Sequence, residues 1–308
     1  MKLYLKQALA VLIVLFSITG CSSRCSCRDK HENDRSNHSS TIVEERPHDE
    51  HSSNEVVTIG SPKHPRGKPQ PHNETSPDPP IEADPLLLVV SEKDIPEQLI
   101  IRKAYVTSYN KDTRCPNWVG WMLTREHTEG TLKRANDFHE DEEVPVPRAT
   151  SADYKGSGWT RGHMCPAGDN KWDRQAMYES FSFVNMCPQN ANLNNGLWNS
   201  MEMDCRKWAK IYGEIYIICG PLFYNQEHET IGENKVAVPE AFFKVILILN
   251  PEPKSFGFIA KNTDGGKKSD IYYHSIDEME RITGYDFFSA LDDEIEDEVE
   301  AEAWKDEI

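Results

Sequence analysis

The sequence has no tail or cluster rich in lysine and arginine. Its 34 basic residues are outnumbered by 51 acidic residues, and the formal net charge is −17. A protein that binds nucleic acid tightly without turning it over normally carries a basic patch, because neutralisation of phosphates dominates its affinity. The composition therefore argues against a tight, non-catalytic nucleic-acid binder. An enzyme is not excluded, since a local cluster of arginines and a divalent cation suffices for turnover.

Paired metal-binding cysteines are also missing from the larger, C-terminal part of the chain. No Cys-x-x-Cys motif occurs between residues 99 and 303, which argues against a zinc site there. This part holds five of the eight cysteines: Cys115, Cys165, Cys187, Cys205 and Cys219. In an exported protein they lie in a disulfide-permissive setting, and at least one of the five is free or pairs outside this part. The connectivity stays open.

The N-terminal apolar run is too short for a comfortable transmembrane helix. It covers residues 8–16, follows two lysines and precedes small residues, a layout typical of an export signal. We therefore expect residues 1–20 to be a signal peptide. The segment Ile-Thr-Gly-Cys that ends at Cys21 resembles the lipobox of bacterial lipoproteins, which implies a lipid on the Cys21 thiol. The protein would then be membrane-anchored, in the periplasm or on the cell surface; the alternative is an ordinary signal peptide followed by an incidental cysteine.

Residues 21–98 have the composition of a linker. They are mostly Ser, His, Pro, Glu, Asp, Asn and Lys, with too little apolar surface to offset the entropy cost of ordering. Several histidines raise the alternative of a metal-binding tract, but their spacing is irregular and no cysteine pairing supports it. We expect a disordered, lipid-anchored linker, in which the apolar run at residues 86–90 is a candidate for docking on the folded domain.

The remaining residues, 99–303, suffice for one domain with a substantial core. Aromatic or β-branched runs predict strands at residues 104–109, 118–123, 181–186, 215–219 and 242–249, with a Cys-Pro turn between the first two. Apolar residues at helical spacing predict a helix that begins near Asn194, and another over residues 291–302. A long loop is expected over residues 125–143, and a loop or hairpin before His163. Strands dominate, so the fold class is α+β.

Two segments carry the side chains with chemical potential. Residues 160–166, Thr-Arg-Gly-His-Met-Cys-Pro, place the Arg161 guanidinium two residues from the His163 imidazole. Residues 193–202 offer amides at Asn194 and Asn195, and then a carboxylate at Glu202. A base, a cation and oxygen ligands are the parts that metal-assisted phosphodiester hydrolysis requires.

These two segments, with Asn-Met-Cys-Pro-Gln at residues 185–189, resemble the DNA/RNA non-specific endonuclease family. This family, of the endonuclease G and Serratia nuclease type, belongs to the ββα-metal (His-Me finger) nucleases. Further matches occur at residues 118–121, 152–154, 219–221, 238–239 with 242–244, and 283–284 with 287–288, so the resemblance covers roughly residues 100–300. It implies an α+β fold with a central, mainly antiparallel sheet flanked by helices. It also implies DNA and RNA as substrates, cut with little sequence preference; no obligate protein partner is evident.

The resemblance implies a role for each matching residue. His163 is the general base that deprotonates the attacking water, and Asn194 is the protein ligand of a single Mg²⁺, for which Mn²⁺ could substitute. Arg161 holds the phosphate or helps to offset its charge, and Glu202 orients metal-bound water. Asn185 orients the site or the His163 loop. Arg134 is a candidate for a second arginine on the phosphate.

Each assignment has a purely structural alternative. His163 could bond a carbonyl group, Asn194 could be a helix N-cap, Glu202 could be an exposed helix charge, and Arg134 could be an ordinary loop residue.

Family members commonly have Asp before the Arg-Gly-His, where this chain has Thr160, so we expect reduced or retuned activity. Two functional alternatives follow: a non-catalytic, surface-anchored binding module that retains the nuclease fold, and a phosphodiesterase or phosphatase for small substrates.

Overall fold

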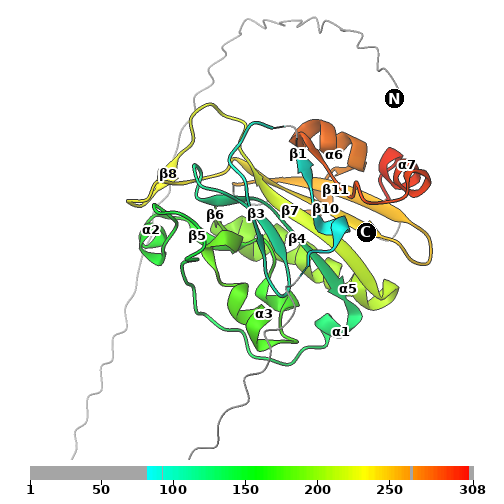
Figure 1. The fold of residues 1–308 in the computed structure, drawn as a ribbon, viewed down its shortest axis with the longest axis horizontal. Coiled ribbons are helices and arrows are strands. Elements are labelled where there is room, and N and C mark those ends of the chain that lie inside the picture. Colours follow the sequence, from blue (N-terminus) through cyan, green and yellow to red (C-terminus); the bar gives the residue numbers. More distant parts are fainter. Residues whose placement is uncertain (1–81, 92, 264–265, 305–308) are drawn as a thin grey trace, which may run out of the picture. The chain divides into compact units, whose positions relative to one another are not determined.

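Seven antiparallel strands form the central sheet of the computed structural model, which describes residues 82–91, 93–263 and 266–304. The expected signal peptide, Cys21 and the linker up to residue 81 lie outside the described residues. Every neighbouring pair in the sheet is antiparallel (Figure 1). In spatial order, the strands are β12 (Tyr273–His274), β11 (Lys254–Lys261), β10 (Ala241–Ile248), β7 (Glu214–Leu222), β4 (Cys115–Thr124), β3 (Val106–Asn110) and β2 (Gln98–Ile101).

The inner strands are buried on both faces, which explains their nearly continuous apolar sequences. Along β10, Phe242 and Ile246 enter one hydrophobic cluster, whereas Phe243, Val245 and Leu247 enter the other. The first cluster is closed by α5 (Asn199–Tyr212) and by the paired strands β5 (Thr160–His163) and β6 (Met186–Gln189). The second is closed by α6 (Ile276–Thr283) and α7 (Asp293–Ala301), which lie side by side (Figure 1).

The folded domain includes residues upstream of 99, where the sequence analysis placed its start. The turn η1 (Pro85–Leu87) and strand β1 (Val90–Ser91) precede the sheet, and β1 pairs with β13 (Tyr285–Asp286). Leu87 and Val89 are buried in the second cluster. The expected docking of the apolar run at residues 86–90 on the folded domain is thereby confirmed.

A ββα unit crosses the first face of the sheet. Strands β5 and β6 pair antiparallel, with Thr160 opposite Gln189, and the chain then continues through α4 (Ala191–Leu193), the π-helical turn η4 (Asn194–Trp198) and α5. Gly162 permits the close approach of the two strands, because a Cβ there would collide with the side chain of Gln189. This unit carries both segments that the sequence analysis singled out.

The observed elements confirm most of the expected ones. Strands over β3, β4, β7 and β10 and helices over α5 and α7 are confirmed, and Trp198 and Met201 are fully buried core residues. Two expectations are wrong. The turn between β3 and β4 spans residues 111–114, so Cys115 and Pro116 begin β4. Residues 183–185 form the 3₁₀ turn η3 (Phe183–Asn185) rather than a strand, because the Ser182 hydroxyl accepts the amide hydrogen of Val184.

The remaining elements are short. They are α1 (Arg125–Thr128), within the expected loop, α2 (Ser151–Tyr154), η2 (Ala167–Asp169), α3 (Arg174–Glu179), β8 (Thr230–Ile231), β9 (Val236–Ala237) and η5 (Lys268–Asp270). All five cysteines between residues 115 and 219 are buried free thiols. Among the described residues, no helix has the length and apolar character needed to cross a membrane.

Candidate active site

A cavity of about 390 Å³ opens beside the ββα unit. Five of the six side chains predicted from the sequence line it, and Asn185 does not. Three guanidinium groups line this cavity, although the net charge of the chain is −17. The lining residues are Arg134, Arg161, His163, Pro166, Ala167, Gly168, Asn194, Asn195, Asn199, Glu202 and Arg206.

His163 ends strand β5, and its imidazole is enclosed by aromatic rings. The ring of Phe181 meets it edge-on at 4.9 Å between centroids, and Phe138 lies 5.7 Å away. Nε2 is buried and has no hydrogen-bond partner in the part of the chain that the structure describes, so the alternative that this atom bonds a carbonyl group is wrong. Burial, together with the charges of Arg134 and Arg161, lowers the pKa of His163 to about 3. The imidazole is therefore neutral at physiological pH.

The same two rings hold the arginines of the cavity. The Arg161 guanidinium lies 4.0 Å from the centroid of Phe138, and that of Arg134 lies 5.1 Å from the centroid of Phe181. Both contacts are within the range of cation–π attraction. Neither guanidinium belongs to an ion pair in the part of the chain that the structure describes. Both remain available to an anion in the cavity.

Asn194 is fixed by a hydrogen bond across the ββα unit. Its Nδ2 donates to Oγ1 of Thr160 at 2.9 Å, and this hydroxyl donates to the carbonyl of Gln189 at 2.7 Å. With Nδ2 engaged, Oδ1 is the acceptor atom that the amide can offer to the cavity. The N-cap alternative for Asn194 is wrong, because Asn190 caps this helical segment by accepting the amide hydrogen of Asn192.

Asn185 is completely buried behind the cavity and braces the chain that follows His163. Its Oδ1 accepts from the Cys165 amide at 2.8 Å, and its Nδ2 donates to the carbonyls of Cys165 and Ser180, each at 2.8 Å. Of the two roles expected for Asn185, the geometry fits the orientation of the His163 loop. A direct contact with substrate does not fit its position.

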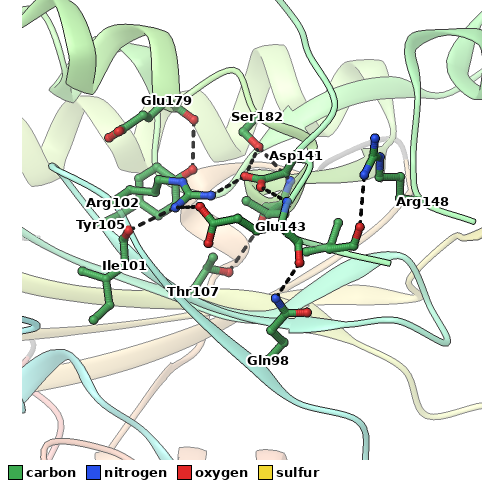
Figure 2. A network of polar contacts seen from close by, with 12 residues as sticks. Gln98, Ile101, Arg102, Tyr105, Thr107, Asp141, Glu143, Arg148, Glu179 and Ser182 are labelled. Carbon is green, nitrogen blue, oxygen red and sulfur yellow. Dashed lines mark hydrogen bonds and ion pairs between the residues drawn. The ribbon is translucent and has the colours of Figure 1, made fainter. Parts of the chain in front are cut away.

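A network of polar contacts ties Glu179 and Ser182, which precede Asn185 in the chain, to residues at the edge of the sheet (Figure 2). Arg102 binds Asp141 at 2.6 Å, and Asp141 accepts a hydrogen bond from Ser182 at 3.0 Å. On the sheet side, the Tyr105 hydroxyl donates to the carbonyl of Glu179 at 2.9 Å. These bonds hold Glu179 and Ser182 against the connection between β2 and β3, and thereby support Asn185, which braces the chain that follows His163.

Glu202 lies in the first turn of α5 and is half-buried at the cavity wall. Burial raises the pKa of its carboxyl to about 7, although the nearby positive charge of Lys244 opposes the shift. The alternative of an exposed helix charge is wrong. Carboxyl groups that titrate near neutral pH inside a cavity are common among functional residues.

Arg206 is a further arginine of the cavity, and it was not predicted from the sequence. It follows Glu202 by four residues, which places both on one face of α5. Its guanidinium binds the buried Asp169 at 2.7 Å. This i,i+4 spacing is the signal that could have identified it, but the partner that fixes it lies 37 residues away in the chain.

A buried ammonium group acts on Glu202 at the cavity wall, where burial raises the pKa of the carboxyl and this positive charge lowers it. Lys244 is fully buried, and among the described residues its Nζ has no hydrogen-bond partner. The Nζ lies 4.4 Å from the ring centroid of Trp198 and 5.0 Å from that of Trp121. Trp121 donates its Nε1 hydrogen to Asp169 at 3.1 Å. Lys244 is thus linked to Arg206 through one aromatic ring and one carboxylate.

The antiparallel sheet, with a ββα unit that presents an imidazole, an amide and guanidinium groups to one cavity, defines a ββα-metal nuclease fold. The chain belongs to the DNA/RNA non-specific endonuclease family, whose model matches residues 83–294. The expected family and fold are thereby confirmed.

Known nucleases are similar to this chain in sequence, and a solved structure is similar to it in fold. The mitochondrial nuclease EXOG of Xenopus laevis is 36% identical over 239 residues, which cover 71% of this chain and 66% of that protein. Nuclease C1 of Cunninghamella echinulata var. echinulata is 35% identical over 209 residues, or 62% of this chain and 82% of that protein. A chain in the crystal structure of the EndoG/EndoGI complex superposes with a TM-score of 0.60 and 29% identity, covering 64% of this chain and 87% of that chain. This chain therefore spans 66% of the length of the mitochondrial relative.

Proposed function

We propose that this protein is a metal-dependent endonuclease that hydrolyses phosphodiester bonds of DNA and RNA with little sequence preference. Membership of the family and the names of its nuclease relatives support this function. One observation carries it: His163, Asn194 and three guanidinium groups converge on one cavity. A neutral base, an oxygen ligand and groups that bind an anion are all within that space.

The residues of the cavity fit a single Mg²⁺, with Mn²⁺ as a substitute. Magnesium commonly keeps several waters and binds few protein ligands, so one amide oxygen and a nearby carboxylate are chemically sufficient. Asn194 would hold the ion through Oδ1, since Thr160 already engages its Nδ2. Glu202 would orient a water bound to the ion. The bound ion would stabilise the charge that develops on the phosphate in the transition state.

His163 would take the proton from the attacking water. Its Nε2 is enclosed, so the proton would be accepted at Nδ1 while Nε2 keeps its own hydrogen. A pKa of about 3 alone would make a weak base. A phosphodiester bound between Arg134 and Arg161 would offset their charges and raise the pKa of His163 toward the working range. The substrate would thereby help to activate the base that deprotonates the attacking water.

The arginines would bind and neutralise the phosphate. Arg134 and Arg161 form no ion pair among the described residues, whereas Arg206 is held by Asp169. Delocalised guanidinium groups suit phosphate recognition because their donors match its oxygens in pairs. This local cluster would let a strongly acidic protein engage a polyanion.

The direct test is cleavage of supercoiled plasmid by the purified protein in Mg²⁺ and in Mn²⁺, with and without EDTA. His163→Ala should reduce the rate by about 10³-fold, in the range of a lost general base. His139→Ala is the matched control, since this histidine stacks on Tyr178 and does not line the cavity. Full cleavage by His163→Ala, or metal-independent cleavage, would contradict the proposal.

The same assay separates the alternatives. A protein that binds nucleic acid but never cuts it would support a non-catalytic binding module. Faster hydrolysis of a small chromogenic diester than of plasmid would support a phosphodiesterase for small substrates.

The anchored location is a separate part of the proposal. We propose an exported bacterial lipoprotein, attached to the membrane through lipid on Cys21, with residues 21 to about 82 as its linker. The lipobox-like segment before Cys21 supports this. Metabolic labelling with radioactive palmitate should mark the protein, and Cys21→Ser should abolish the label. An unlabelled wild-type protein in the soluble fraction would contradict the anchor.

A further inference from the structure

A second cavity, of about 640 Å³, adjoins the candidate active site. The two cavities share Arg161, Asn194 and Asn195 in their walls. Its volume lies within the range of roughly 300–1,000 Å³ found for ligand sites, so it has room for a nucleotide unit. A nucleic-acid strand whose phosphate binds beside Arg161 and Asn194 would therefore have the second cavity next to that phosphate.

The chemistry of the second cavity suits a nucleotide. Its charged lining groups are Lys155 and Arg161, and no carboxylate is among its lining residues. Asn136 and Ser151 add an amide and a hydroxyl group, and Trp159 adds the largest aromatic surface. Positive charge, neutral hydrogen-bonding groups and an aromatic ring are the groups that bind the phosphate, sugar and base of a nucleotide.

Trp159 is held in place at the wall. Its Nε1 donates to Glu229 at 2.8 Å, and its partly buried ring packs against the hydrophobic cluster on this face of the sheet. The glycine Gly158, with φ of +88°, lets the chain turn into this position at little cost. Trp159 directly precedes Thr160, whose hydroxyl holds the Asn194 amide. The ring is therefore fixed one residue from the contact that orients the proposed metal ligand.

We propose that this cavity is a nucleoside subsite, in which the base next to the scissile phosphate stacks on Trp159 and Lys155 binds the following phosphate. This subsite rests on the proposed function, and it names the part of the substrate that the second cavity recognises. Stacking is tolerant of sequence, because every base presents a π-face. The subsite thus adds affinity without adding sequence preference.

The test measures binding apart from cleavage. The full-length protein with His163→Ala is titrated with a fluorescein-labelled single-stranded 12-mer in Mg²⁺, and the dissociation constant is read by anisotropy. Adding Trp159→Ala should weaken binding about tenfold, as expected for one lost base–aromatic stack, and Trp159→Phe should weaken it less. Trp172→Ala is the control, because this ring stacks on His127 and lines neither of the two cavities.

Two further measurements keep the inference testable if Trp159→Ala fails to fold. Lys155 is exposed, so the Lys155→Ala protein should fold. Its slope of log Kd against log salt should be smaller by about 1, the change expected for the loss of one phosphate contact. A scan with abasic 12-mers should find one position whose missing base weakens binding to the His163→Ala protein. A missing base at that position should not weaken binding further once Trp159 is also replaced.

The outcomes distinguish the two claims. Normal binding by the folded Trp159→Ala protein, or a flat abasic scan, overturns the subsite and leaves the proposed function standing. No binding of the 12-mer by the His163→Ala protein overturns both. An equal loss for Trp159→Ala and Trp172→Ala indicates general destabilisation and also overturns the subsite.

Discussion

The side-chain amide of Asn194 is held by the hydroxyl of Thr160, 2.9 Å away. Thr160 occupies the position at which family members commonly have aspartate, and its oxygen supplies the acceptor that an aspartate could also supply. The difference is charge, because a hydroxyl is neutral and in turn donates to the carbonyl of Gln189. Thr160 therefore keeps a means of orienting Asn194 while leaving the cavity with one negative charge fewer.

Removing this hydroxyl should misorient the proposed metal ligand. We predict that Thr160→Val, which keeps the side-chain shape, lowers kcat/KM in Mg²⁺ by about 10- to 100-fold, the usual effect of losing a partner of a metal ligand. Thr160→Ser should stay within about threefold of wild type, since it keeps the acceptor. Steady-state cleavage over a Mg²⁺ titration measures both; equal activity of Thr160→Val and wild type would show that the bond does not matter.

Some of this architecture was accessible from the sequence, and some depended on distant contacts. The runs at β7 and β10 predicted strands because both faces of those strands are buried, and the periodicity of α5 was equally plain. The motif residues converged because they sit on one ββα unit. Arg206 was missed because its fixed position depends on Asp169. The docking of residues 86–90 was expected from their apolar run, but the place of Leu87 inside the domain depends on the second face of the sheet.

The rate should depend on the charge of Glu202. Burial raises the pKa of its carboxyl to about 7, so the carboxylate form is lost as the pH falls below that value. We predict that kcat/KM falls about tenfold per pH unit below neutrality, and that more Mg²⁺ moves this limb to lower pH by stabilising the charged form. His163, with its pKa near 3, stays neutral over this range. Rates measured from pH 5 to 9 should lose the limb in Glu202→Gln; a limb that persists there would assign it to another group.

The buried Lys244 should serve activity more than stability. Among the described residues its charge contacts two tryptophan rings and makes no hydrogen bond, so an apolar group of similar size would remove the cost of keeping an unpaired charge buried. We predict that Lys244→Met keeps or raises the Tm but lowers kcat about tenfold, because Trp121, Asp169 and Arg206 lose their electrostatic support. In an Arg206→Ala background the same change should cost little. A parallel fall in Tm and kcat would contradict this reading.

The contact between α6 and α7 should weaken at alkaline pH. One ligand-type oxygen from each of Asp277, Glu280 and Glu300 lies within 4.8 Å of the others. Burial and the neighbouring carboxylates raise the pKa of Glu300 to about 8 and that of Glu280 to about 7. Both values exceed the ordinary ones, so stability is present at low pH and is lost as the pH rises through 7 to 8.

Glu300→Gln should therefore stabilise the protein where the wild-type carboxyl is ionised. We predict a rise in Tm of about 3 °C at pH 9 and no change at pH 5, measured by calorimetry. Glu298→Gln, an exposed substitution on the same helix, should change neither value. A gain that is equal at both pH values would exclude ionisation as its cause.

The central claim is that one divalent ion binds at Asn194 within reach of His163. Anomalous diffraction from crystals soaked in Mn²⁺ tests it most directly. We predict one strong peak about 2.2 Å from Oδ1 of Asn194, absent in crystals of Asn194→Ala. A peak at Asp277, Glu280 and Glu300 with nothing at Asn194 would contradict the account.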